Sequence, residues 1–213
     1  MAPIQLPTSD CELAFHAAGY TFVAGVDEVG RGALAGPVVA GCVVIGQGSL
    51  SELGALVRDS KTMSALQRER AYEAVQRLSI ACSVGMIPAE DIDRMGLGPA
   101  NRMALEMAVH RLGFEPDALI CDAFVIEHAA PQVALIDGDA RSVSVAAASI
   151  LAKVVRDRLM TELHDVWPEY GFARHVGYGT RVHLEALGRC GPCPEHRKSF
   201  APVRASLDRV VLL

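Results

Sequence analysis

Short apolar runs with the length of β-strands dominate the first quarter of the chain. Two of them lie within residues 21–45, and glycines and a proline separate them, which is typical of a hairpin of adjacent strands. The first run contains two consecutive acidic residues, Asp27 and Glu28. The pattern therefore predicts a strand that carries charge into an apolar environment.

The middle of the chain alternates between helical and strand-like spacing. Ser64 and the glutamine three residues later match a capping box, which begins a predicted helix that ends near Ser79. A strand is expected over residues 80–87, and a helix with proline in its first turn over about 99–112. Apolar residues at helical spacing predict the longest helix over residues 146–166.

Two further apolar runs end directly before acidic residues. Residues 118–121 lead into Asp122, and residues 133–136 lead into a turn that contains Asp139. Strands that alternate with helices predict an α/β layered domain. The acids would then lie at the ends of neighbouring strands.

Length and composition are consistent with a single compact domain. The chain has 213 residues, of which 51% are hydrophobic, so it can bury a substantial core. We expect an N-terminal segment over residues 1–20, an α/β core over 21–166, and a C-terminal helical and loop region over 167–213 that packs on this core. No apolar run is long enough to cross a bilayer, and no Lys or Arg precedes Arg31, so we expect a cytoplasmic protein without a membrane span.

Charge is distributed unevenly along the chain. The net charge of −5 argues against a generally basic surface for nucleic acid. Residues 86–139 nevertheless contain ten acidic against three basic residues, whereas residues 172–209 contain seven basic against three acidic residues. The first region could hold metal cations, and the second could contact phosphates.

The six cysteines are scattered, and we expect free thiols in a reducing compartment. Cys190 and Cys193 form a Cys-x-x-Cys pair that His196 follows. A structural zinc site normally takes its remaining ligands from a second such pair, which the sequence does not offer. We therefore expect no zinc here.

The pair Asp27 and Glu28 would be costly to bury unless it binds a cation or a partner charge. The alternative is an ordinary strand edge at which Glu28 points to water. Successive strand side chains face opposite ways, so both acids can reach one metal centre only if the backbone is irregular there. The flanking residues Gly25 and Gly30 would permit such irregularity.

Asp122 and Asp139 add carboxylates at two more strand ends. Mg²⁺ prefers carboxylate oxygens and retained waters, so four such acids could hold two ions for phosphodiester hydrolysis. The alternative for residues 137–139 is a plain turn. A calcium loop is excluded because the later ligands and the closing bidentate glutamate are absent.

Several stretches, in order along residues 23–203, resemble the ribonuclease HII family. They are residues 25–32, 34–40, 59–61, 147–157, 175–180 and 196–203. The resemblance implies a ribonuclease H-like mixed β-sheet flanked by helices, with a C-terminal helical extension. It also implies that Asp27, Glu28, Asp122 and Asp139 are catalytic and bind Mg²⁺ or Mn²⁺, with two ions during catalysis.

The same resemblance implies how substrate is recognised. Gly30, Arg31 and Gly32 correspond to the family's loop that senses a ribonucleotide, where close backbone approach to the 2′-hydroxyl favours glycine. Tyr178 corresponds to the tyrosine that packs on the next sugar, although it could also be an ordinary half-buried residue. Lys61 and Lys153, which lie in matched stretches, are candidates for phosphate contacts.

Arg197 and Lys198 have the same chemistry as those lysines. For each of the four cations, the alternative is a solvated surface charge. One departure from the family concerns Asp137, which stands where lysine is usual and adds negative charge beside Asp139.

The activity implied by the resemblance is endonucleolytic. The protein would cleave the RNA strand of RNA–DNA hybrids, and the 5′ side of ribonucleotides in duplex DNA, leaving 3′-hydroxyl and 5′-phosphate ends. Its partner would be such a duplex, with no membrane and no obligate protein partner. Two alternatives are a metal-dependent DNA repair endonuclease of related fold and a catalytically silent hybrid-binding module.

Overall fold

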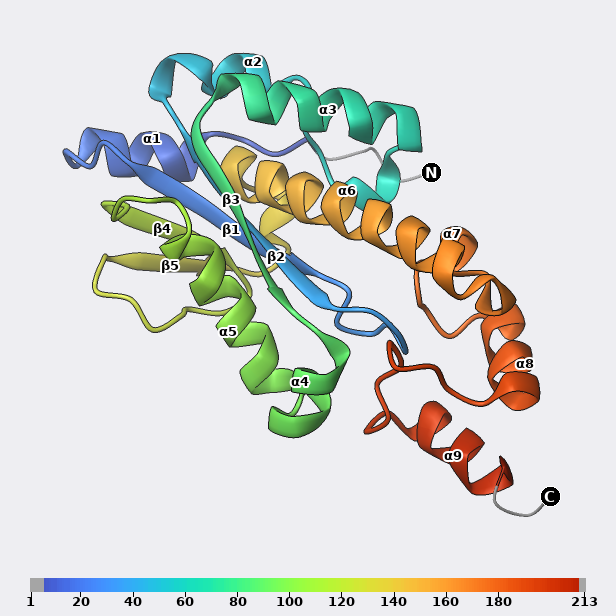
Figure 1. Ribbon diagram of the computed structural model, residues 1–213. Helices are drawn as coiled ribbons and strands as arrows, with labels where there is room; N and C mark the ends of the chain where they lie inside the picture. The colour runs from blue at the N-terminus through green and yellow to red at the C-terminus, as the bar shows by residue number, and fades with distance from the viewer. Residues whose placement is uncertain (1–5, 211–213) are drawn as a thin grey trace. The chain divides into compact units, whose positions relative to one another are not determined.

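The computed structural model describes residues 6–210, with side chains described up to residue 207 (Figure 1). The chain divides into two compact units. The sheet unit comprises Met1–Val29, Val39–Met86 and Arg102–Val154, and the helical unit comprises Gly30–Val38, Ile87–Asn101 and Val155–Leu213. The division expected at residues 20 and 166, within a single domain, stays a prediction.

One mixed sheet organises the sheet unit. Its strands are β1 Val23–Val29, β2 Val38–Ile45, β3 Ser79–Ile87, β4 Ala118–Asp122 and β5 Gln132–Leu135. The strand order is β3-β2-β1-β4-β5, in which β1 pairs antiparallel with β2 and parallel with β4, and β4 pairs parallel with β5. The hairpin and the three later strands expected from the apolar runs are confirmed.

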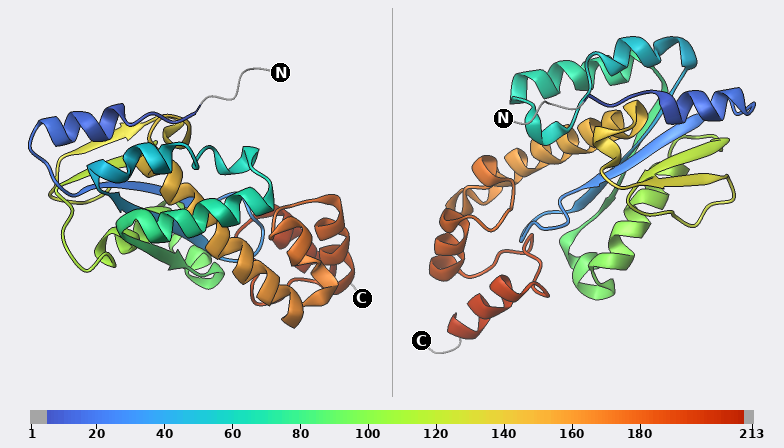
Figure 2. Two further views of the ribbon diagram at one scale, coloured as in Figure 1. Left: turned by 90° about the horizontal axis from the view of Figure 1, so that it is seen from above. Right: turned by 180° about the vertical axis from the view of Figure 1, so that it is seen from behind.

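Helices cover both faces of this sheet. The elements are α1 Asp10–Ala17, α2 Leu50–Gly54, α3 Ala65–Leu78, α5 Leu97–His110 and α6 Val143–Val166, with short 3-10 turns at Gln47–Ser49, Ser60–Thr62 and Gly138–Ala140. Within the sheet unit, α1 and the first half of α6 lie on one face, and α5 lies on the other (Figures 1 and 2). The mixed sheet flanked by helices expected from the sequence is confirmed.

Two glycines bring α6 very close to the central strands. A Cβ atom on Gly25 of β1 would clash with the backbone of Ser144, and a Cβ atom on Gly41 of β2 would clash with the carbonyl of Ala148. Side chains two apart on a strand share a face, so Asp27 points to the same side as Gly25. The first half of α6 therefore packs directly beside Asp27.

The helical unit has its own apolar core. It contains α4 Ala89–Met95, the 3-10 turn Pro168–Tyr170, α7 Phe172–His175, α8 Arg181–Cys190 and α9 Ala201–Val210. Met160, Phe172, Leu187 and Val203 are buried together there. The segment of residues 30–38 contributes Leu34 and Ala35 to the same core, which anchors the segment within this unit.

The capping box at Ser64 is confirmed, because its hydroxyl accepts the Gln67 N–H and the Gln67 side chain accepts the Ser64 N–H. The short helices α1, α2 and α4 were not expected, since each is too short to show a clear period. Among the described residues, no helix is long and apolar enough to span a membrane.

Candidate active site

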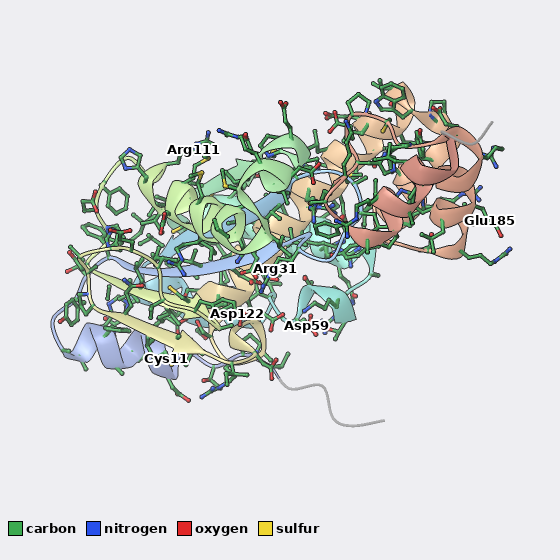
Figure 3. The ribbon with its side chains drawn as sticks, turned by 90° about the horizontal axis from the view of Figure 1, so that it is seen from below. Cys11, Arg31, Asp59, Arg111, Asp122 and Glu185 are labelled. Carbon is green, nitrogen blue, oxygen red and sulfur yellow. The ribbon has the colours of Figure 1, made fainter. Side chains whose placement is uncertain are left out.

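Strand register brings Asp27 and Asp122 to one edge of the sheet. β1 and β4 run parallel with Val26 opposite Cys121, so the two acids follow at the same level. Asp122 lies at the end of β4, opposite Leu135 of β5 (Figure 3). Asp139 lies four residues beyond Leu135, in the 3-10 turn Gly138–Ala140. The structure thus brings together the acids that the sequence placed at strand ends.

Asp27 is a buried carboxyl group with 5% of its surface exposed. Burial and the charges of Glu28, Asp122 and Asp139 raise its pKa well above the usual value, and a hydrogen bond from the Ser149 side chain opposes this rise. The Ser149 hydroxyl lies 3.3 Å from that of Ser60, which precedes Lys61. Asp27 therefore accepts a hydrogen bond from α6 and is surrounded by other acidic residues.

Glu28 follows Asp27 without any irregularity of the strand. The register continues regularly from Asp27 opposite Gly41 to Val29 opposite Val39. Glu28 consequently leaves β1 on the face opposite to Asp27. The Glu28 amide donates to Asp27 Oδ1 at 2.7 Å, which fixes one oxygen of that carboxylate.

Asp122 is tied to the turn that carries Asp139. Its Oδ1 accepts the Gly138 N–H at 2.7 Å, and Gly138 has no side chain to displace it. Asp139 is 8% exposed, and burial together with Asp59, Asp122 and Asp137 raises its pKa, whereas Lys61 lowers it. The exposed residue Asp137 adopts a left-handed conformation with φ 54°, and its charge acts on Asp139.

Lys61 supplies positive charge to this acidic cluster. Its Nζ lies 3.7 Å from Asp139 Oδ2, and its backbone N–H donates to the Asp59 side chain at the start of the turn Ser60–Thr62. Partial burial lowers the pKa of Lys61, but Asp139, Asp59, Asp27 and Asp122 outweigh this effect and raise it. Most of the Lys61 side chain remains exposed, as a phosphate contact requires.

The acids fit an open divalent-cation site. Oxygen donors and unbalanced negative charge around Asp27 suit a hard cation such as Mg²⁺. Among the described residues, no group of three or more Asp, Glu, His or Cys side chains could hold a metal ion by itself. Mg²⁺ commonly takes one or two carboxylates, with substrate phosphates and waters completing its shell. Asp27, Asp122 and Asp139 would hold the cations in this manner. Glu28 would have to reach them around the strand, and its charge already acts on the carboxyl group of Asp27.

The residues expected to recognise the ribonucleotide, which are Gly30, Arg31, Gly32 and Tyr178, lie in the helical unit. Gly30 has φ +90°, which favours glycine. Gly32 is exposed, and a Cβ atom added there would lie 3.9 Å from the Tyr178 ring. Tyr178 is half-buried, and the guanidinium of Arg156 lies 5.7 Å from its ring centre. The structure therefore places the glycine loop beside Tyr178.

The other three basic residues that the sequence suggested as phosphate contacts, Arg197, Lys198 and Lys153, differ in burial. Arg197 is fully buried and bonded to backbone carbonyls, so it is not available as a surface contact for phosphate. Lys198 lies on the surface, where its backbone N–H donates to Asp93 of α4. Lys153 is half-buried on α6, one turn after Ser149, and its phosphate role stays a prediction.

Cys193 and His196 are buried and in contact with each other. The Cys193 N–H donates to His196 Nδ1 at 3.0 Å, and the Cys193 sulfur lies 3.1 Å from the same atom. Cys190 is exposed at the end of α8. All six cysteines are free thiols, as expected.

Three buried polar residues were missed from the sequence. Ser149 and Arg156 lie on α6, whose sequence pattern is mainly apolar, and both are buried. A single polar residue at an apolar position of the helix is the only sequence feature that could have identified them. Glu12 is 1% exposed on α1 and accepts hydrogen bonds from Ser142 and Ser144 at the start of α6. Its partners are 130 residues away, so nothing local identifies it.

Comparisons with known proteins give one consistent result. The family model described as "Ribonuclease HII" matches residues 24–203. A ribonuclease HII from Chlamydia trachomatis serovar D is 48% identical over 194 residues, covering 91% of this chain and 88% of that protein. The ribonuclease H2 structure from Pyrococcus horikoshii is 28% identical with a TM-score of 0.77, covering 88% of this chain and 97% of that chain.

A further similar structure is the Archaeoglobus fulgidus ribonuclease HII in its complex with PCNA. It is 25% identical with a TM-score of 0.69, and the match covers 84% of this chain and 95% of that one.

Proposed function

Because the chain belongs to the ribonuclease HII family, whose model matches residues 24–203, we propose that it cleaves the RNA strand of RNA–DNA hybrids and the 5′ side of ribonucleotides in duplex DNA. It is an endoribonuclease, and the observation that carries the mechanism is the gathering of carboxylates around Asp27. The products would be 3′-hydroxyl and 5′-phosphate ends.

Two Mg²⁺ or Mn²⁺ ions would activate the attacking water and stabilise the leaving oxygen of the phosphodiester. Asp27 supplies a carboxylate that the Glu28 amide and the Ser149 hydroxyl hold in place. Asp122 fixes the turn of Asp139 through the Gly138 N–H. Preorganised carboxylates of this kind need little rearrangement when substrate binds.

Lys61 has two roles in this proposal. Its charge favours the ionised form of Asp139, and its exposed ammonium would contact a phosphate of the nucleic acid. Gly30, Arg31 and Gly32 would recognise the ribonucleotide through its 2′-hydroxyl, while Tyr178 would pack against the next sugar. Lys153 would make a further contact to the phosphate backbone.

Cleavage of defined duplexes tests this function. An end-labelled DNA duplex with one ribonucleotide, an RNA–DNA hybrid and an all-DNA duplex are incubated with the protein and Mg²⁺ or Mn²⁺. We expect a cut 5′ to the ribonucleotide, cuts along the hybrid, and an intact all-DNA duplex. Cutting of the all-DNA duplex would instead support a DNA repair endonuclease.

A matched pair of variants tests the assigned acids. Asp139→Asn removes one charge from the cluster, and Asp10→Asn makes the same change on the exposed surface of α1. We expect a loss of cleavage of several orders of magnitude in the first variant and none in the second. Unchanged cleavage by Asp139→Asn would remove this residue from the metal site. Binding without cleavage by the unaltered protein would support a silent hybrid-binding module.

A further inference from the structure

Two arginines of the helical unit are completely buried. Arg156 on α6 and Arg197 before α9 each have 0% of their surface exposed. Buried charges are normally matched by carboxylates. The six hydrogen bonds described for these two guanidinium groups end instead on backbone carbonyl oxygens.

Those carbonyls belong to the segments that flank the recognition residues. Arg156 donates to Pro37 at 2.9 Å, to Ala35 at 3.0 Å and to Val176 at 2.8 Å. Arg156 therefore links the segment after the glycine loop to the segment just before Tyr178. Its guanidinium also faces the Tyr178 ring, at 5.7 Å from the ring centre.

Arg197 holds the glycine loop itself. It donates to the Arg31 carbonyl at 2.8 Å and twice to the Gly36 carbonyl, at 3.0 and 2.9 Å. Gly30 packs on the other arginine, because a Cβ atom there would clash with the Arg156 guanidinium. Because Arg197 holds the Arg31 carbonyl and Gly30 packs against Arg156, the loop has little freedom to change shape.

The segment before Tyr178 is held in a strained conformation. Val176 has φ 44°, a left-handed conformation that a β-branched residue rarely adopts. The Val176 carbonyl accepts from Arg156, and the Gly177 carbonyl accepts from the Leu34 and Ala35 amides. Strain of this kind persists only where the surrounding bonds over-determine the backbone.

We propose that Arg156 and Arg197 are positioning residues for ribonucleotide recognition, which fix the Gly30–Gly32 loop relative to Tyr178 without contacting the substrate. Discrimination between a ribonucleotide and a deoxyribonucleotide would then depend on the geometry of these carbonyl bonds. This inference rests on the proposed function, because it concerns how the same substrate is selected.

Lysine substitutions test the inference, since lysine keeps the charge but lacks the planar fork that bridges separate carbonyls. Arg156→Lys and Arg197→Lys are compared with Arg204→Lys, which alters an exposed arginine of α9. Binding to a duplex with one ribonucleotide and to an all-DNA duplex is measured by fluorescence anisotropy in the Asp139→Asn background. KM and kcat are measured separately in proteins that retain Asp139.

In both buried-site variants, we expect the ratio of the affinities for the ribonucleotide duplex and the all-DNA duplex to fall about tenfold to a hundredfold. A loss of this size is typical when a binding group is misplaced by about an ångström. KM for the single-ribonucleotide duplex should rise, with less change in kcat, while Arg204→Lys retains both values. An unchanged preference in the folded lysine variants would overturn the proposal. Failure of both variants to fold, judged by circular dichroism, would also overturn it, because the arginines would then support the unit as a whole.

The starting protein separates this proposal from the proposed function. If it does not cut 5′ to the ribonucleotide, the function itself fails. If it cuts there and the lysine variants keep their selectivity, only the positioning role fails.

Discussion

The Ser149 side chain hydrogen-bonds to the carboxylate of Asp27, across the close contact between α6 and β1. Asp27 faces α6 because it shares a strand face with Gly25, and the missing side chain of Gly25 lets the helix approach. A hydrogen bond to a charged group contributes about 1.5–3 kcal/mol. The helix therefore both buries the acid and stabilises its ionised form.

Ser149→Ala should weaken cation binding and cleavage together. The loss of a charged hydrogen bond predicts a decrease of about tenfold to a hundredfold in Mn²⁺ affinity, because Asp27 would be less ionised and less well oriented. Isothermal titration calorimetry with Mn²⁺ measures this directly, with cleavage of a hybrid as a second readout.

Ser206→Ala provides the matched control, because Ser206 is a buried serine whose hydroxyl bonds only locally, to the Val203 carbonyl. Equal Mn²⁺ affinities in the two serine variants would show that Ser149 does not support the metal site.

Asp27→Asn should stabilise the protein in the absence of divalent cations. The folded-state pKa of Asp27 is raised above its unfolded value, so its favourable contribution is present at low pH and is lost as pH rises through the folded pKa. At neutral pH, well above the unfolded value, this carboxyl therefore contributes unfavourably whether it is charged or has bound a proton, and an uncharged amide removes that cost. We expect a Tm several degrees higher in EDTA, since about 1 kcal/mol corresponds to roughly 2–4 °C at this size.

Added Mg²⁺ should raise the Tm of the unaltered protein more than that of Asp27→Asn, because the cation offsets the charge. Asp10→Asn should behave like the unaltered protein in both conditions. A lower Tm for Asp27→Asn in EDTA would contradict the unfavourable charge.

Local patterns were sufficient to predict most of the sheet unit. The capping box at Ser64 and the apolar runs before Asp122 and Asp139 identified a helix and two strand ends correctly. The backbone at Asp27 and Glu28 could not be settled from the sequence, because the sequence does not show that the regular register with β2 continues through both residues. With this register the two acids leave β1 on opposite faces.

The supporting polar network could not be predicted, because its partners are distant in sequence. In the sequence, Arg197 is one of several basic residues near the C-terminus. The carbonyl groups to which its side chain donates hydrogen bonds lie more than 160 residues earlier. Only the fold shows that this charge is buried and bonded to Gly36 and Arg31. Burial of a charged side chain depends on tertiary contacts that have no local signature.

Glu12 should be essential for the start of α6. One carboxylate oxygen accepts the Ser142 hydroxyl at 2.6 Å, the Ser144 hydroxyl at 2.7 Å and the Ser144 N–H at 2.8 Å. Glu12→Ala removes the acceptor of these three bonds from a buried position. Each buried polar group left unsatisfied costs about 1–3 kcal/mol, so we expect a loss of about 3–5 kcal/mol in the free energy of unfolding. Urea denaturation measures the loss. As a control, Glu52→Ala alters an exposed glutamate of α2 and should change the free energy of unfolding by less than about 0.5 kcal/mol. Similar losses in both variants would contradict the role of Glu12.

His183 and His196 should make the protein less stable in acid. The carbonyl of Tyr178 accepts the His183 Nδ1–H, so His183 Nε2 accepts from His196 Nε2, and His196 Nδ1 accepts the Cys193 N–H. Both rings are thus neutral. Burial lowers the pKa of His183, and burial with the nearby His183 lowers the pKa of His196 to about 4.

Because these folded-state values lie below the unfolded value of about 6.5, the stabilisation is present above that pH. It is lost as pH falls from about 6.5 toward 4, where His196 becomes protonated. In His196→Gln, Tm should be lower at neutral pH but should fall less between pH 7 and pH 5 than in the unaltered protein. His110→Gln alters an exposed histidine of α5 and should retain the full decrease. Asp27 contributes a change in stability of the opposite sign as pH falls, but this change is common to all three proteins. A decrease in Tm of equal size in His196→Gln would therefore show that the histidine pair does not cause the acid sensitivity.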